Sequence, residues 1–360
     1  MKYIGKLLGF ILLGINVMVA LLMLLSAYSP SIDPHAHPVV SCMGLFFPVF
    51  LLANVLFLIF WAIVYRRFIL FPLLALIVCW SSIRTYFPIN IFEEDAPEKA
   101  IKIVSYNTRG FGEMKPHTKD CPNEVLTYLQ NSNADIICLQ EYILGGKLKK
   151  KDVDYALRDY RYKHYLSLGK GLNGLGCYSR YPILSAIPIL YKGTRNGSVA
   201  YRIQVGGDTL LVVNNHLESN KILKSDVETY QEMIDTPNKQ NLFAGVRKLW
   251  GKMAEATSIR AKQTDVLVET IKNSKEKAVV FCGDFNDTPL SYTHHVLCEE
   301  LQDAFVETGN GLGVSYNKDR LYVRIDHILV SKNLNVYDCT VDNTIEASDH
   351  YPVWCYISLQ

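Results

Sequence analysis

Charged residues are nearly absent from the first quarter of this 360-residue chain. Its net charge of +2 gives no excess of one sign, so bulk attraction to nucleic acid or acidic lipid is not implied. The nine cysteines form no CxxC pair and no metal-finger spacing, which excludes a zinc ribbon or a thiol redox motif. No nucleophilic serine or cysteine motif is present either. The uneven distribution of apolar residues is therefore the first positive signal.

Two uncharged runs near the N-terminus, residues 7–28 and 44–65, are long enough to cross a bilayer, which takes about 20 apolar residues. A third run, 68–83, is shorter and ends at Arg84, so a third span and a re-entrant segment both stay open. A cleaved signal peptide fits the first run less well, because its apolar core is too long and no small-x-small cleavage site follows. We predict a transmembrane region over residues 1–91 with two to three spanning helices, and a membrane bilayer as its partner.

Basic residues predict the orientation of these spans. Lys2 and Lys6 precede the first run, two arginines at 66–67 follow the second, and the loop 29–43 has neither Lys nor Arg. The basic ends should face the cytoplasm, so a third crossing would carry the rest of the chain outside. We expect an integral protein of the inner or cell membrane with an extracytoplasmic domain, although seven cysteines in that domain are more typical of a reducing compartment.

The remainder of the chain has the composition of a soluble domain. An acidic stretch with a proline, residues 92–99, predicts a linker to a domain over residues 100–360. Near-continuous runs of Val and Ile indicate strands that are covered on both faces, and helices are expected at 122–131 and 257–272. The stretch 219–256 departs from this pattern. It is interpreted either as a helix packed on the core or as a lid or basic helix at the membrane surface.

Polar side chains follow the apolar runs, where the strands are expected to end. They comprise four carboxylates, three carboxamides and two imidazoles: Asn107, Glu141, Asn215, His216, Asp284, Asn286, Asp326, Asp349 and His350. Each of them alone has an ordinary explanation as a turn or capping residue. Together they predict a shared site, because strands that end at the same edge of a sheet bring such groups together.

The residue types limit the chemistry of such a site. Carboxylate and carboxamide oxygens suit hard ions such as Mg²⁺ or Mn²⁺. A divalent cation beside imidazoles fits hydrolysis of a phosphoester by direct attack of water. Three of the other seven histidines lie near the site motifs in the sequence and are not assigned to the site. His327 is predicted to be structural, since it points away from Asp326 in a strand, and His294 and His295 are expected at the surface.

Six short motifs resemble those of the endonuclease/exonuclease/phosphatase superfamily, which includes deoxyribonucleases, neutral sphingomyelinases and inositol polyphosphate 5-phosphatases. In chain order the motifs are SYN (105–107), LQE (139–141), NNH (214–216), GDFN (283–286), RID (324–326) and SDH (348–350). The resemblance covers about residues 100–360. It implies an α+β fold, a four-layer α/β/β/α sandwich with its site at one sheet edge, and metal-dependent hydrolysis of a phosphoester.

The resemblance also implies roles for the residues that match these motifs. Glu141 would bind the divalent metal with help from Asn107, and Asp349 would serve the same region. Asp284 would orient or deprotonate the attacking water, and Asn286 would hold the phosphate or that water.

The two site histidines receive roles in the same way. His350 would contact the phosphate, with Asp326 fixing its ring and raising its pKa. His216, with Asn215 beside it, would stabilise the developing charge or the leaving oxygen.

The resemblance indicates the reaction more closely than the substrate. We expect a membrane-anchored phosphodiesterase or phosphatase whose phosphoester substrate is a lipid or a nucleic acid. One alternative is an extracytoplasmic DNA endonuclease, since the histidine of NNH is more typical of deoxyribonucleases and sphingomyelinases than of abasic-site enzymes. Another is a catalytically inactive, membrane-anchored binding module. No feature of the sequence predicts a protein partner.

Overall fold

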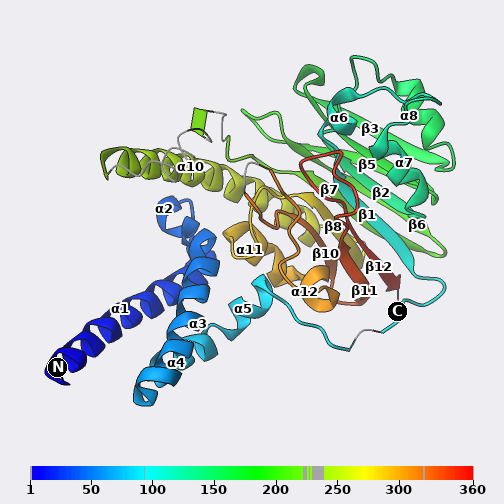
Figure 1. The fold of residues 1–360 in the computed structure, drawn as a ribbon. Helices are drawn as coiled ribbons and strands as arrows, with labels where there is room; N and C mark the ends of the chain where they lie inside the picture. The colour runs from blue at the N-terminus through cyan, green and yellow to red at the C-terminus, as the bar shows by residue number, and fades with distance from the viewer. Residues whose placement is uncertain are drawn as a thin grey trace.

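The computed structural model describes residues 2–92, 94–221, 225, 226, 228, 239–318 and 321–359. Its N-terminal helices lie to one side of a layered α+β domain (Figure 1). The helical elements of this first part are α1 (Lys2–Tyr28), η1 (Ser29–Ser31), α2 (Pro38–Ser41), η2 (Cys42–Phe46), α3 (Phe47–Val64), η3 (Arg66–Phe68), α4 (Leu70–Val78) and α5 (Trp80–Tyr86).

Two helical stretches in this part, Gly5–Ser31 and Pro38–Val64, are long and apolar enough to cross a membrane. They contain most of the predicted runs 7–28 and 44–65. The third run falls on a pair of helices, Arg66–Val78 and Trp80–Tyr86, that are bent by 62° against each other, so it is either one broken span or a re-entrant loop. Many apolar side chains of α1, α3 and α4 are exposed, and a surface of that kind needs a partner such as lipid.

The domain contains two six-stranded sheets. The first has the order β11-β12-β1-β2-β4-β3 and the second β5-β6-β7-β8-β10-β9. The strands of the first sheet are β1 (Ile101–Asn107), β2 (Ile136–Gln140), β3 (Tyr162–Leu168), β4 (Asn173–Ser179), β11 (Leu334–Val341) and β12 (Val353–Leu359). Those of the second sheet are β5 (Ile183–Leu190), β6 (Gly197–Val205), β7 (Asp208–His216), β8 (Ala278–Asp284), β9 (Leu301–Asp303) and β10 (Asp326–Ser331).

Side-chain alternation along the strands explains the layers. In β8, Val280 and Cys282 join the core between the two sheets, whereas Val279 and Phe281 face the opposite way, in the cluster that includes Leu267. The helices of the domain are α6 (Arg109–Met114), α7 (Glu124–Asn131), α8 (Lys150–Ala156), η4 (Gly169–Gly171), α10 (Lys239–Lys272), α11 (Tyr292–Glu300) and α12 (Ala304–Thr308). Helices α7 and α8 cover the first sheet and α10 and α11 the second (Figure 1). The predicted four-layer α/β/β/α sandwich is confirmed.

The predicted helices are present with altered bounds. The helix expected at 122–131 begins at Glu124, because Asn123 caps it by accepting a hydrogen bond from the Leu126 N–H at 3.1 Å. The helix expected at 257–272 is the C-terminal half of α10. Of the stretch 219–256, residues 222–224, 227 and 229–238 lie outside the described residues. Its remaining helical part reaches beyond the sheet and contacts the N-terminal helical region (Figure 1).

Strand register assembles one end of the sandwich. Asp284, the last residue of β8, is paired with His216 of β7 on one side and with Asp326 of β10 on the other. Glycine is required just before it, since a Cβ on Gly283 would lie 2.0 Å from the carbonyl oxygen of Asn215 and φ is +137°. In the first sheet, Asn107 ends β1 at the same edge.

Candidate active site

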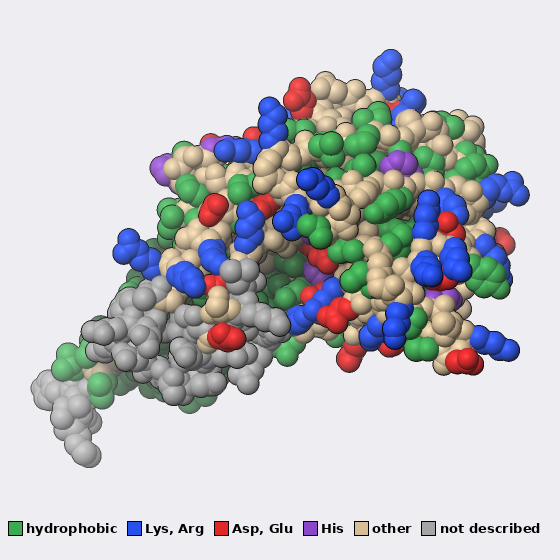
Figure 2. Space-filling view, turned by 90° about the horizontal axis from the view of Figure 1, so that it is seen from above, with side chains coloured by type: hydrophobic (Ala, Val, Ile, Leu, Met, Phe, Trp, Pro, Cys, Tyr) green, Lys and Arg blue, Asp and Glu red, His purple; other side chains and the backbone are tan. Residues whose placement is uncertain are grey.

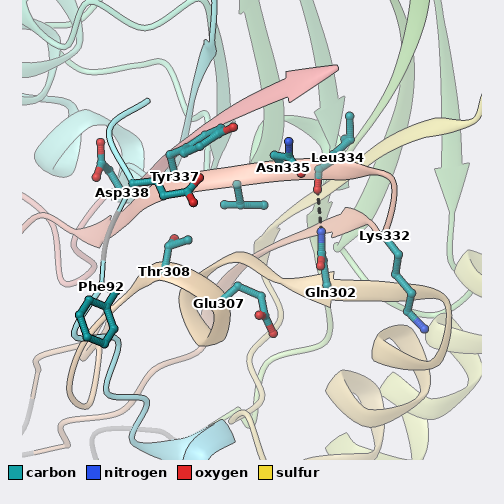
Figure 3. A pocket seen from close by; sticks show the side chains of 11 residues that line it. Phe92, Gln302, Glu307, Thr308, Lys332, Leu334, Asn335, Tyr337 and Asp338 are labelled. Carbon is teal, nitrogen blue, oxygen red and sulfur yellow. Dashed lines mark hydrogen bonds between the residues drawn. The ribbon is translucent and has the colours of Figure 1, made fainter. Parts of the chain in front are cut away.

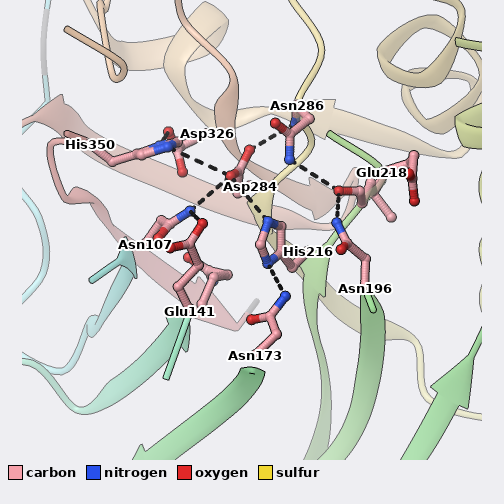
Figure 4. Close-up of polar contacts among 12 residues, drawn as sticks. Asn107, Glu141, Asn173, Asn196, His216, Glu218, Asp284, Asn286, Asp326 and His350 are labelled. Carbon is pink, nitrogen blue, oxygen red and sulfur yellow. Dashed lines mark hydrogen bonds and ion pairs between the residues drawn. The ribbon is translucent and has the colours of Figure 1, made fainter. Parts of the chain in front are cut away.

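Asp284 lies at the centre of a group of polar side chains (Figure 4). Its Oδ2 accepts a hydrogen bond from Asn107 Nδ2 at 2.9 Å, and its Oδ1 accepts one from the backbone N–H of Asn286 at 2.8 Å. The Nε2 atoms of His216 and His350 lie 3.6 Å and 3.8 Å from Oδ2. The Asp284 carboxylate is thus surrounded by donors and held in one orientation.

Asn107 bridges two acidic side chains. Its amide nitrogen also lies 3.3 Å from Glu141 Oε1, while its oxygen accepts from the Arg109 N–H at 3.2 Å. Glu141 follows β2 with φ of 47°, a backbone conformation that non-glycine residues adopt at a cost and that recurs at functional sites. The amide N–H₂ therefore lies between Glu141 and Asp284, where a cation would also be stabilised. The oxygen donors fit Mg²⁺ or Mn²⁺.

His350 and Asp326 form a buried pair, with Nδ1 and Oδ2 2.7 Å apart. Burial raises the pKa of Asp326 to about 6, and the nearby charge of Asp284 adds to this effect. Burial by itself would lower the pKa of His350, but the charges of Asp326 and Asp284 outweigh it and raise the pKa to about 10. His350 is therefore a hydrogen-bond donor whose Nε2 faces Asp284, and the ring of Tyr316 packs edge-on against it.

Asn173, the first residue of β4, orients His216. Its Oδ1 accepts a hydrogen bond from the Gly174 N–H at 2.7 Å, which leaves the amide nitrogen to donate to Nδ1 of His216 at 3.1 Å. Because Nδ1 is an acceptor, the ring proton lies on Nε2, which faces Asp284.

Asn286 is fixed by the loop that follows β7. Its φ is 53°, and its amide donates to the carbonyl oxygen of Leu217 at 3.0 Å. Asn196 donates to the same oxygen. The loops after β7 and β8 therefore hold each other beside the Asp284 carboxylate.

Two of the predicted residues lie apart from this group. Asn215 is on the opposite face of β7 from His216, and its amide donates to the carbonyl oxygens of Val213 and Cys282 at 2.9 Å and 3.0 Å. Strand alternation places its neighbour Asn214 on the inner face instead. The Asp349 carboxylate lies at the rim, 3.5 Å from a guanidinium nitrogen of Arg109.

A left-handed turn supports the rim. Residues 109–114 all have positive φ, which costs roughly 1–2 kcal/mol for each residue with a Cβ. The Gly110 N–H donates to the Glu141 carbonyl oxygen at 3.0 Å, and the fully buried Phe111 ring packs edge-on against Tyr142. These contacts hold Arg109 beside Asp349 at a cleft of about 340 Å³.

Seen from above, acidic, basic and histidine side chains gather around a hollow near the middle of the domain (Figure 2).

A separate cavity of about 380 Å³ is lined by Phe92, Glu307 and Tyr337 (Figure 3). There, Gln302 donates to the Leu334 carbonyl oxygen at 2.8 Å. None of its lining residues belongs to the polar group around Asp284.

The prediction that His294 lies at the surface is wrong. His294 is 3% exposed and its Nε2 lies 2.8 Å from Asp303 Oδ2, because α11 packs on the outer face of β10. His327 completes this second cluster and bonds the Asp287 carbonyl oxygen at 3.0 Å. The cluster has a spacing that could hold a metal, as has the group of Asp284, Asp326 and His350.

Sequence reasoning missed the residues that position the others. Asn173 starts a strand as a lone polar residue, Gln140 donates to Asn214 Oδ1 at 2.7 Å across the two sheets, and Tyr316 lies in a loop. The one available signal was the buried pattern around Gln140 and Asn214, two amides inside apolar runs.

A sandwich of two sheets with carboxylates, amides and a buried His–Asp pair at one end defines a hydrolase of phosphoester bonds. The chain belongs to the Endonuclease/Exonuclease/phosphatase family, whose sequence model matches residues 104–350. A second model, for a domain of unknown function, matches residues 9–86.

Individual proteins are similar at low identity. An exodeoxyribonuclease of Bacillus subtilis (strain 168) is 22% identical over 293 residues, which cover 72% of this chain and all of that protein. Truncated TDP2 of Caenorhabditis elegans is 16% identical, with a TM-score of 0.48 over 73% of this chain and 99% of its own. A family protein of Bacteroides thetaiotaomicron is 17% identical, with a TM-score of 0.49 over 74% and 100%.

Proposed function

We propose that this protein is a membrane-anchored, divalent-metal-dependent phosphoester hydrolase in which water attacks phosphorus directly. The observation that carries the proposal is the convergence on Asp284. Donors from β1, β7 and the segment before β12 surround one buried carboxylate at the end of β8.

The cation would be held on the side of Glu141. This carboxylate is only half-buried, and the Asn107 amide places it beside Asp284. His350 is a poor ligand because its raised pKa of about 10 keeps both ring nitrogens protonated, so that neither has a lone pair for a cation. A divalent cation bound there would neutralise charge on the phosphoryl oxygens. Asp349, paired with Arg109, would complete the negative rim of that region.

The remaining groups would act on the water and on the phosphoryl group. Asp284 takes a proton from the attacking water. At the same time the water oxygen forms a bond to phosphorus, and the bond between phosphorus and the ester oxygen breaks. His350 Nε2 donates to a phosphoryl oxygen, where negative charge grows in the transition state. His216 Nε2, on the other side of Asp284, donates to the leaving oxygen, and Asn286 holds the water or the phosphate.

The helix arrangement supports a third crossing and an extracytoplasmic domain. The Phe68 ring lies 6.0 Å from that of Phe10, and the Ser82 hydroxyl lies 3.4 Å from the Ala27 carbonyl oxygen. Residues 68–82 thus run along about 25 Å of α1, at 1.5 Å per residue. The arginines at 66–67 are then at the end of the bundle away from the domain. A C-terminal alkaline phosphatase fusion should be active, and an inactive fusion would reverse this topology.

Nucleic acid is the second candidate substrate, because the Bacillus relative is named an exodeoxyribonuclease. A lipid phosphoester is favoured by a tether that concentrates the site near a bilayer. A panel of duplex DNA, sphingomyelin, inositol phosphates and simple diesters, with and without EDTA, separates the two. An inactive binding module is disfavoured, since the reactive residue types are retained in all six motifs.

The test uses the full chain in detergent with bis-nitrophenyl phosphate and Mg²⁺. Glu141→Gln should abolish metal-dependent turnover, whereas the matched exposed change Glu299→Gln should leave it intact. Undiminished turnover by Glu141→Gln would refute the metal role of Glu141. No turnover by the wild type on any member of the panel would refute the hydrolase.

A further inference from the structure

The loop after β8 carries two site residues and then enters the N-terminal helical bundle. Asp284 and Asn286 lie at its start, and Leu290, only four residues beyond Asn286, is 5% exposed. Leu290 belongs to a hydrophobic cluster whose other buried members all come from the N-terminal part of the chain: Met23, Phe47 and Cys79. A side chain of the site loop is therefore part of the bundle core.

The 3₁₀ helix η2 is fitted closely to the same loop. A Cβ on Gly44 would lie 1.9 Å from the carbonyl oxygen of Leu290, so a larger residue would push η2 and the loop apart. Two residues earlier, Cys42 Sγ lies 3.5 Å from the Thr257 hydroxyl of α10. The turn between α2 and α3 thus rests on the site loop and on α10 at once.

Helix α10 extends this contact surface. The Trp250 indole stacks on the Phe46 ring, with centroids 4.9 Å apart and planes 10° apart, and its N–H donates to the Val39 carbonyl oxygen at 3.0 Å. A second contact is made by the segment that follows α5. There the Asn90 amide donates to the carbonyl oxygens of Val306 and Gly309. Further described contacts of the same kind join Ser31 to His295 and Arg84 to Glu307, so the N-terminal region and the domain meet over more than the loop after β8.

Arg260 of α10 connects this surface to both site loops. Its guanidinium is 2% exposed and makes four hydrogen bonds, each of 2.9–3.0 Å, to Asp287 Oδ2, the Glu218 carbonyl oxygen, Asn220 Oδ1 and the Thr257 hydroxyl. Asp287 is next to Asn286, and Glu218 and Asn220 follow His216 by two and four residues. A buried charge with all these partners fixes the distance between the two loops.

We infer that the N-terminal helical region is a structural part of the candidate active site, and that Arg260 is the positioning residue that joins them. Leu290 and Gly44 fix the loop after β8, and Thr257 fixes the guanidinium. Arg260 in turn holds the loops that carry Asn286 and follow His216. This inference rests on the proposed hydrolysis for its activity measurement, but its conformational part is independent of it.

A passive tether makes a different prediction. If the bundle only held the domain at a membrane, loosening the contact would change thermal stability and leave turnover of a small soluble diester unchanged. If the bundle positions the loops, the same change lowers kcat with little effect on KM, because the substrate still binds but the groups around Asp284 are displaced.

The test compares two glycine substitutions in the full chain in detergent. Gly44→Ala should lower kcat at least tenfold and increase amide hydrogen exchange in residues 285–291. The control Gly14→Ala, in α1, has nothing within 4 Å of the added Cβ and should match the wild type in both measurements. Wild-type kcat and exchange in a folded Gly44→Ala variant would overturn the inference.

Two further comparisons keep the inference testable if Gly44→Ala does not fold. Leu290→Ala should act like Gly44→Ala, whereas Leu184→Ala, at a 52% exposed position on β5, should not. Arg260→Gln should lose kcat, with partial recovery in Arg260→Lys. The inference would also be overturned if folded Leu290→Ala and Arg260→Gln variants kept the kcat and the amide hydrogen exchange of the wild type. If the wild type itself shows no turnover, the proposed function fails and the exchange measurements alone decide the coupling.

Discussion

Two buried His–Asp pairs lie on opposite faces of the second sheet. His350 and Asp326 are 2.7 Å apart at the inner face of β10, and His294 and Asp303 are 2.8 Å apart at the outer face. In both pairs burial by itself would lower the histidine pKa. The neighbouring groups outweigh burial and raise the pKa to about 10 in each case. The residue types and pairing distances are therefore almost the same in the two places.

The pairs differ in what lies beyond them. The second nitrogen of His350 faces Asp284 at 3.8 Å in the candidate active site. The second oxygen of Asp303 accepts the N–H groups of Phe305 and Val306, which cap α12, and α11 covers the pair. The outer pair therefore bonds to groups of the fold itself, whereas the inner pair keeps an N–H donor available for a ligand. The same chemistry thus serves stability in one place and reactivity in the other.

The largest expected effect is on the inner side, at the carboxylate that both site histidines face. Asp284→Asn keeps the shape but removes the acceptor for the proton of water, so kcat should fall by about 10³–10⁴-fold. Circular dichroism should show that the variant is folded at the assay temperature. Activity within tenfold of wild type would mean that the proton goes elsewhere.

On the outer side the expected effect is on folding. His294→Gln leaves Asp303 buried without its cation, which should lower the free energy of unfolding by roughly 3–5 kcal/mol. Measured well below its melting temperature, the variant should retain most of its turnover. A variant that is stable but inactive would show that this pair also serves the reaction.

The stability difference between wild type and His294→Gln should depend on pH. The raised pKa of His294 makes its contribution complete below pH 6.5, and it is lost as pH rises toward about 10. Burial alone would raise the pKa of Asp303, but His294 and Arg324 hold it well below its usual range. The stabilisation that ionised Asp303 adds to the folded state is lost as pH falls below 3.8. Denaturant unfolding should therefore give the largest difference between about pH 4 and 6.5, and a constant difference would contradict this ion pair.

A smaller effect is expected when only the inner pair is altered. Asp326→Asn removes the charge that raises the pKa of His350 and loosens its ring, so kcat should fall by about 10²-fold. The alkaline limb of the pH–rate profile should also move to lower pH, because His350 loses its proton earlier. An unchanged alkaline limb would show that protonated His350 does not limit the rate.

The smallest expected effect concerns the amide that fixes the other site histidine. Asn173→Ala frees Nδ1 of His216 without removing the imidazole, and kcat should fall by about tenfold with a near-normal KM. The exposed change Asn273→Ala is the matched control. If the two variants are equally active, the orientation of His216 does not depend on Asn173.

The sequence predicted the strands well and the contacts between them poorly. The apolar run from Ile101 to Asn107 became β1 with those bounds, and the polar ends of β7 and β8 meet as expected. The same reading assigned Asn215 to the site and His294 to the surface. Both errors concern the face on which a side chain lies, and that depends on register and on which helix packs above.

The amino-acid order alone determined which segments are apolar enough to form buried strands or long apolar helices, since periodicity and polarity act locally. Tertiary packing decided three other features. It placed Asp284 beside two imidazoles, inserted Leu290 into the bundle and buried the outer His–Asp pair. These contacts join segments up to 267 residues apart.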